Sequence, residues 1–157
     1  MQIGTRHRRC YLTFETGGPG IVASYTGINP STDDGEKRDQ TTLKLIGFGL
    51  RLGIARWIVV NPFTLRSPDV KALRDHPDPV GPYADSYLRR AYREAELHIA
   101  GWGGTKKVPL RLRPRFDEVV RIAQECGVEL HCLGRNKNGD PRHVLTTGYK
   151  TPLASWP

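Results

Sequence analysis

Two asparagine-proline pairs stand directly after two apolar runs of this chain. The run IVASY, residues 21–25, leads into the stretch GINP, which carries Asn29, and the run ARWIVV, residues 55–60, leads into Asn61. A carboxamide offers both a hydrogen-bond donor and an acceptor, so each asparagine can hold a water molecule or recognise a polar ligand. Asn-Pro is also a common turn, in which the side chain bonds its own backbone. Two such pairs at equivalent places favour a functional site.

Strands and helices must alternate to position these asparagines. Four apolar strands separated by helices indicate an α/β fold: a three-layer α/β/α sandwich around a central, four-stranded, mainly parallel sheet, formed by one domain over residues 1–157. Gly53 and Gly127 are placed to end two of the helices. We predict strands at residues 21–25, 55–60, 96–100 and 128–133, an edge strand at 8–15, and helices at 41–53, 67–75, 81–96 and 113–127, with Ser67 as an N-cap.

The carboxyl ends of parallel strands share one edge of a sheet, and open α/β folds bind their ligands beyond that edge. Besides the two asparagines, this edge would carry Trp102 and two glycines after the third strand, and Arg135 and Lys137 after the fourth. We therefore expect a binding crevice at these four strand ends.

The composition of the chain favours a polyanionic partner. Its 24 Lys and Arg exceed its 16 Asp and Glu, which gives a net charge of +8; basic domains that bind no nucleic acid share this balance. Three cysteines without a CxxC pair predict reduced thiols rather than a disulfide or a zinc site. No segment has the pattern of a signal peptide or of a membrane span, so we expect a cytoplasmic protein.

Three stretches at the predicted strand ends resemble the uracil-DNA glycosylase superfamily. GINPS is similar to the first motif of the mismatch-specific and thymine-DNA glycosylase branch, WIVVNPFTLR resembles the second strand with its base-reading asparagine, and HIAGWGGTKK resembles the third strand. The resemblance keeps the family's order and extends over about residues 20–153. The chain also resembles a family of short bacterial and phage domains that carry Asn-Pro-Ser-Thr at this place.

The resemblance implies a monofunctional DNA glycosylase, which flips a pyrimidine-type base out of DNA, hydrolyses its sugar bond and leaves an abasic site. Asn29 would position the attacking water with help from Asp39 or Asp34, and because an amide is a poor general base, a slow enzyme is implied. Asn61 would read the base, or else form an Asx-turn. The implied base-binding set also contains Ile28, Pro30 and Ser31, with Phe63 or Tyr25 stacking on the base unless these aromatics belong to the core.

The last motif of the family departs from its pattern here. The classical enzymes have a histidine that stabilises the departing base, followed by a loop that presses into the minor groove. In HVLTTGYKTPLASW, residues 143–156, Tyr149 occupies the place of that histidine, and His143 is a second candidate if the loop is shifted.

Four acidic residues follow GINP: Asp33, Asp34, Glu36 and Asp39. Such a cluster is compatible with a magnesium site, but carboxylates are also favoured in the first turn of a helix. Ser31, Thr32 or Asp33 would serve as the N-cap of that helix. We expect neither a metal nor a cofactor.

Basic residues after the third and fourth strands would ring the crevice and neutralise phosphates. Individually, each can equally be a solvated surface charge. The DNA-contact candidates are Thr32, Arg66, Trp102, Lys106, Lys107, Arg135, Lys137, Arg142 and Lys150, joined in the same stretches by Arg111, Arg113 and Arg115.

We expect DNA, with a flipped base, as the partner of a monomeric enzyme. A bulky modified cytosine of viral DNA is a candidate substrate, and phage defence a candidate role. Two other classes stay open: a non-catalytic binder of modified or single-stranded nucleic acid, and a hydrolase or transferase of free nucleotides, in which the positive charge would serve only the substrate phosphate.

Overall fold

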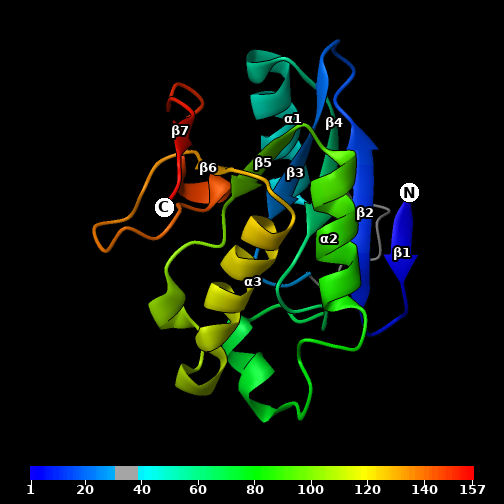
Figure 1. Cartoon of the computed structure of the whole chain (residues 1–157), viewed down its shortest axis with the longest axis vertical. Helices are drawn as coiled ribbons and strands as arrows, with labels where there is room; N and C mark the ends of the chain where they lie inside the picture. The colour runs from blue at the N-terminus through cyan, green and yellow to red at the C-terminus, as the bar shows by residue number, and fades with distance from the viewer. Residues whose placement is uncertain (31–38) are drawn as a thin grey trace.

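A computed structural model describes residues 1–30 and 39–157 of the chain. A seven-stranded mixed sheet runs through the molecule in the order β1-β2-β4-β3-β5-β6-β7, and its four central strands, β4, β3, β5 and β6, are parallel (Figure 1). The strands are β1 (Gln2–Gly4), β2 (Arg9–Glu15), β3 (Ile21–Thr26), β4 (Ile54–Val60), β5 (Leu97–Ala100), β6 (Leu130–Cys132) and β7 (Ala154–Ser155).

The predicted α/β class is confirmed, whereas the predicted four-stranded sheet is too small. The four predicted strands form its parallel centre, and β1, β2 and β7 extend the sheet by antiparallel pairing. The strand predicted at residues 8–15 is not an edge strand, because β1 pairs with its outer side. Strands as short as β1 and β7 carry too little hydrophobic pattern to be recognised from sequence.

The described residues form three α-helices beside the sheet: α1 (Gln40–Leu52), α2 (Ala84–Glu94) and α3 (Pro114–Glu125). Gly53 ends α1 in the left-handed conformation, with φ of 72°, as its position in the sequence predicts. The helix predicted over residues 67–75 is a 3₁₀-helix, η1 (Val70–Asp75), and its N-cap is Asp69 rather than Ser67. The other 3₁₀-helices are η2 (Thr105–Lys107), η3 (Leu110–Leu112) and η4 (Val144–Thr146).

Two hydrophobic cores lie on opposite faces of the sheet. The alternating side chains of β4 serve both: Trp57 packs with α1 residues, while Ile58 packs with residues of α2 and α3. Trp57 is fully buried, and its indole N–H donates to the Leu45 carbonyl at 2.7 Å, which fixes α1 against the sheet. In Figure 1, α1 lies behind the sheet and α2 and α3 lie in front of it.

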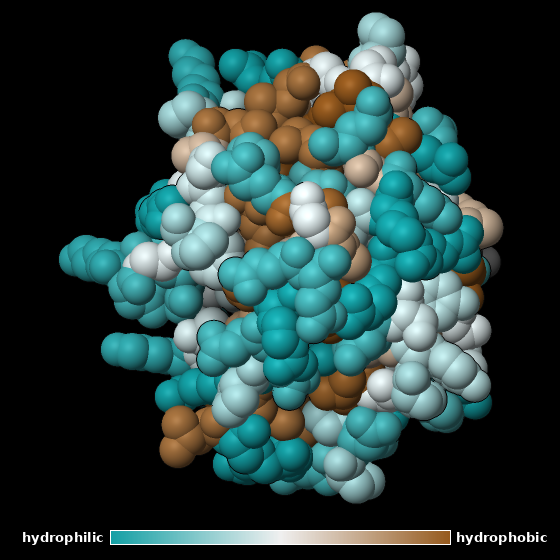
Figure 2. Space-filling model, in the orientation of Figure 1, coloured by the Kyte–Doolittle hydropathy of each residue, from teal (hydrophilic) through white to brown (hydrophobic). Residues whose placement is uncertain are grey.

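The two faces leave the carboxyl edge of the parallel strands open for a site. The start of α1 and the segment before η4 approach this edge from one face, and the segment that contains η2 and η3 follows β5 on the other. The chain termini lie at opposite edges of the sheet (Figure 1). Figure 2 shows that hydrophilic residues cover most of the face that carries α2 and α3, as the amphipathic pattern of these helices requires.

Candidate functional site

A small polar pocket lies beyond the carboxyl ends of β3 and β4. Its volume is about 90 Å³, room for about three water molecules at roughly 30 Å³ each. It brings together four predicted site residues that are far apart in the sequence, Asn29, Asp39, Asn61 and His143. The remaining lining residues among those described are Arg9, Tyr25, Gly27, Ile28, Thr41 and Val59.

Asn61 presents a carboxamide to this pocket. The residue is only 6% exposed, yet its side chain makes no hydrogen bond to any residue that the structure describes. Neither polar atom of this amide is sealed off in the core, so both are open to the pocket. The carboxamide of Asn61 is therefore available to a ligand or to water in the pocket. An Asx-turn would require this side chain to bond its own backbone, and no such bond is present among the described residues.

The side-chain nitrogen of Asn29 is already hydrogen-bonded within the protein. Its Nδ2 donates to the Ser67 carbonyl at 3.0 Å and to the Pro30 carbonyl at 3.2 Å, and neither acceptor residue lines the pocket. These bonds identify the amide nitrogen, so the side-chain oxygen must be the other atom of the carboxamide. Asn29 therefore presents its side-chain oxygen, a hydrogen-bond acceptor, to the pocket.

His143, in contrast to Asn29, presents a hydrogen-bond donor to the pocket. Its Nδ1 accepts the backbone N–H of Leu145 at 3.2 Å. Burial lowers the pKa of His143, and the positive charge of Lys107 adds to this effect, while Asp39 opposes it. The imidazole is thus neutral near pH 7, and because Nδ1 is an acceptor, the proton is on Nε2. His143 can donate a hydrogen bond from Nε2.

Asp39 connects the pocket to α1. It is the N-cap of the helix, where its carboxylate accepts the Thr42 N–H at 2.7 Å. Asp39 and the buried Arg9 bring one charge of each sign to the lining. The predicted caps Ser31, Thr32 and Asp33 lie outside the described residues, as do Asp34 and Glu36.

Tyr149, the other candidate of the last motif, lies away from the pocket. Its ring packs on Phe48 of α1 at 5.0 Å between centroids, and the ammonium of Lys44 lies 4.2 Å from the ring centre. Tyr149 is 40% exposed to solvent. The last motif therefore contributes His143 to the pocket and Tyr149 to the outer packing of α1.

The two candidate stacking aromatics have different places. Tyr25 forms a wall of the pocket, but it is buried, its hydroxyl donates to the Gly101 carbonyl at 2.8 Å, and burial raises its pKa. Phe63 is not at the pocket: it is fully buried in the core on the α2 and α3 face, edge-on to Phe116. The expected stacking role of Phe63 is wrong, because the chain after Asn61 turns toward that core.

Some of the basic residues expected to contact DNA are exposed, whereas others are buried or hydrogen-bonded within the protein. Lys106, Lys107, Lys137 and Lys150 are exposed. Arg115 is not a rim residue: it is buried and pairs with Asp85 and Glu118. Trp102 is likewise buried, in the core beneath a second cavity. The guanidinium groups of Arg111, Arg113, Arg135 and Arg142 donate to backbone carbonyls, and Arg66 is half-buried beside the Asn29 loop.

Sequence reasoning missed Arg9 and Thr41. Arg9 begins β2, and an antiparallel neighbour of β4 begins where β4 ends, so its first residue reaches the pocket. That adjacency is not visible in the sequence. Thr41 follows Asp39 in the first turn of α1, and recognition of Asp39 as the N-cap would have found it.

The fold and the pocket together define an α/β protein with a polar site at the carboxyl edge of its parallel strands. The chain belongs to the family described as "Protein of unknown function (DUF1643)", whose profile matches residues 12–145. No curated protein and no solved structure matches it.

Within residues 1–30 and 39–157, no three His, Cys, Asp or Glu side chains gather as metal ligands would. None of the described helices combines the length and apolarity that crossing a bilayer requires.

Proposed function

We propose that this protein is a DNA glycosylase that hydrolyses the N-glycosidic bond of a flipped pyrimidine and leaves an abasic site. The observation that carries the proposal is the convergence of Asn29, Asn61 and His143 on one pocket, with an acceptor, an unsatisfied carboxamide and a donor facing the same space. These are the groups that recognition and release of a nucleobase need.

The arrangement of the fold supports the same proposal. The three stretches that resemble the uracil-DNA glycosylase superfamily lie at the carboxyl ends of β3, β4 and β5, which are adjacent and parallel. We infer that the central sheet is the counterpart of the sheet in that superfamily.

In the proposed reaction, each side chain has one task. Asn61 pairs with the polar edge of the base, because its carboxamide can donate and accept at once. The Asn29 oxygen holds the attacking water, and the Asp39 carboxylate helps to orient it toward the sugar carbon. His143 donates from Nε2 to the departing base, on which negative charge develops as the bond breaks. The released base leaves with the proton of the water.

The size of the pocket bears on the substrate. A volume of about 90 Å³ favours a small pyrimidine over a glycosylated cytosine, whose sugar would have to project through the mouth of the pocket. Exposed lysines such as Lys106 and Lys107 would neutralise the flanking phosphates.

Base release from defined DNA tests the proposal. Oligonucleotides that carry uracil, a thymine mismatch or a modified cytosine are incubated with the protein, cleaved with alkali, and examined by mass spectrometry for free base. We expect release by the natural protein and at least a hundredfold loss in Asn29→Ala and Asn61→Ala, with DNA affinity retained. Asn136→Ala, outside the pocket, is the matched control. DNA binding without release of any base would overturn the proposal in favour of a non-catalytic binder.

A further inference from the structure

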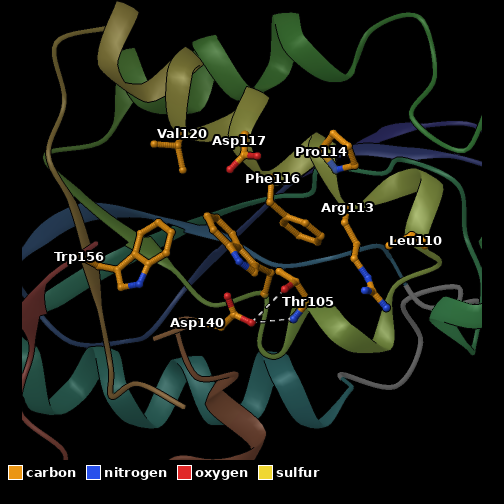
Figure 3. A pocket seen from close by; sticks show the side chains of 10 residues that line it. Thr105, Leu110, Arg113, Pro114, Phe116, Asp117, Val120, Asp140 and Trp156 are labelled. Atoms are coloured by element: carbon orange, nitrogen blue, oxygen red, sulfur yellow. Dashed lines mark hydrogen bonds between the residues drawn. The ribbon is translucent and has the colours of Figure 1, made fainter. Parts of the chain in front are cut away.

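A second cavity, of about 430 Å³, lies on the other face of the sheet beside α3. Figure 3 shows Phe116 and Asp117 of α3 on one side of it, Trp156 on another, and Asp140 and Thr105 facing them. The groups proposed for base release take no part in this cavity. It is large enough to hold a ring system.

The apolar part of the cavity is an aromatic corner. Trp102 forms its floor and is edge-on to Trp156, with 5.0 Å between ring centroids and an interplanar angle of 89°. Phe116 packs on Trp102 at 5.3 Å. The indole N–H of Trp156 donates to the Gly139 carbonyl at 2.9 Å, which holds this ring in place. Trp102 is only 1% exposed, so the ring that can meet a planar ligand is that of Trp156, which is partly exposed and is held by this bond and by its contact with Trp102.

The polar part of the cavity accepts hydrogen bonds. Asp117 makes no hydrogen bond or ion pair with any described residue. Asp140 is oriented by Thr105, whose backbone N–H donates at 2.9 Å and whose hydroxyl donates at 3.1 Å. Arg113 donates to the Val108 and Lys106 carbonyls, so its guanidinium is committed to the loop. The polar group that the cavity offers is therefore the exposed carboxylate of Asp117, which can accept hydrogen bonds from a ligand with N–H donors.

The segment η2 joins this cavity to the proposed base pocket. Thr105 lines the cavity, while the charge of Lys107, two residues later, acts on His143 in the base pocket. On the intervening loop, a Cβ at Gly103 would lie 3.5 Å from the His143 Cβ. The loop at residues 103–107 therefore lies beside both the aromatic cavity and the base pocket.

We propose that the aromatic cavity binds an unpaired nucleobase with an exocyclic amino group, carried by the nucleotide next to the one that enters the base pocket. This inference rests on the proposed function and adds a preference for the neighbouring base. The Trp156 ring stacks on the base and the Asp117 carboxylate accepts from its amino group. The exposed ammonium groups of Lys106 and Lys107 beside the cavity disfavour a free organic cation as its occupant.

Indole resonances give a test that does not depend on catalysis. The chain has three tryptophans, so Trp156→Phe assigns one of the three indole N–H signals directly. Single-stranded trinucleotides of cytosine or adenine should shift the Trp156 signal, and all-thymine trinucleotides should bind about tenfold more weakly. Asp117→Ala should remove that tenfold preference. Asp75→Ala, an exposed carboxylate outside the cavity, is the matched control and should retain it.

A base-release assay with varied neighbours separates this inference from the proposed function. If base is released and a neighbouring cytosine or adenine is preferred about tenfold over thymine, both stand. Release without any neighbour preference, together with an unmoved Trp156 signal, overturns only the inference. If no base is released but cytosine trinucleotides shift the Trp156 signal, only the proposed glycosylase function is overturned. A Trp156 shift with spermidine and none with trinucleotides would identify an organic-cation site and also overturn the inference.

Discussion

Gly27 and Asn61 are in direct contact across the ends of β3 and β4: a Cβ at Gly27 would lie 2.8 Å from the side-chain oxygen of Asn61. Real side chains do not tolerate that distance, so glycine is required for the carboxamide to take its place. The backbone of one Asn-Pro loop thereby forms the support for the asparagine of the other.

Gly27→Ala is expected to displace Asn61 and to lower base release at least tenfold. The fold should survive, because the displaced atom is the end of a side chain and can rotate away. Steady-state base release and a thermal melt measure the two effects. Gly148→Ala serves as the control, since no atom lies within 4 Å of its Cβ. Full activity of Gly27→Ala would show that the position of Asn61 is unimportant.

Two substitutions of Asp39 should separate its structural role from its charge. Asp39→Asn keeps an N-cap side chain for α1 and should leave the free energy of unfolding nearly unchanged, while base release falls at least tenfold. Asp39→Ala should lose the same activity and, in addition, about 1 kcal/mol of stability. Urea titrations and base-release rates distinguish the cases. Equal activity of Asp39→Asn and the natural protein would restrict Asp39 to capping.

The neutral state of His143 predicts an acid limb in the pH profile. Protonation of Nδ1 would break the bond from the Leu145 N–H and change the donor geometry, so activity should fall as the pH drops. Because burial lowers the pKa of His143, the midpoint of this fall should lie below 6.5. In His143→Gln the rate should drop about a hundredfold and the acid limb should flatten. A midpoint above 6.5 would contradict the assignment.

Tyr149→Phe should leave base release unchanged. The tyrosine ring packs on Phe48 and under Lys44, and substitution by phenylalanine keeps these contacts. Rates measured beside those of His143→Gln test which residue of the last motif serves the pocket. A tenfold loss in Tyr149→Phe would return the tyrosine to the site.

His98 should make stability depend on pH. It is buried beside Ser24, with 3.0 Å between Nδ1 and the serine hydroxyl, and burial lowers its pKa. Below pH 6.5 the unfolded chain therefore binds more protons than the native state, and stability falls as the pH drops toward the native pKa. His143 contributes with the same sign. Urea midpoints at pH 7.5 and 5.5 should differ less in His98→Gln than in the natural protein; equal differences would exclude His98.

Local patterns predicted the parallel centre of the sheet well. The strands at β3, β4, β5 and β6 and the end of α1 at Gly53 follow from side-chain periodicity and from the freedom of glycine, which act over a few residues. The antiparallel strands β1 and β7 were not predicted, because strands of three and two residues carry too little side-chain pattern.

The sequence by itself predicted that Asn29 and Asn61 follow strands of one parallel sheet, since the side-chain period and the alternation of strands with helices can be read along the chain. Only the tertiary structure decided that His143 rather than Tyr149 joins them, that Arg9 enters the lining, and that Phe63 and Arg115 turn to the opposite core. The physical reason is that a side chain's direction at the end of an element depends on what packs against it. Those partners lie as many as 119 residues away, as between Val144 and Tyr25, where no local pattern records them.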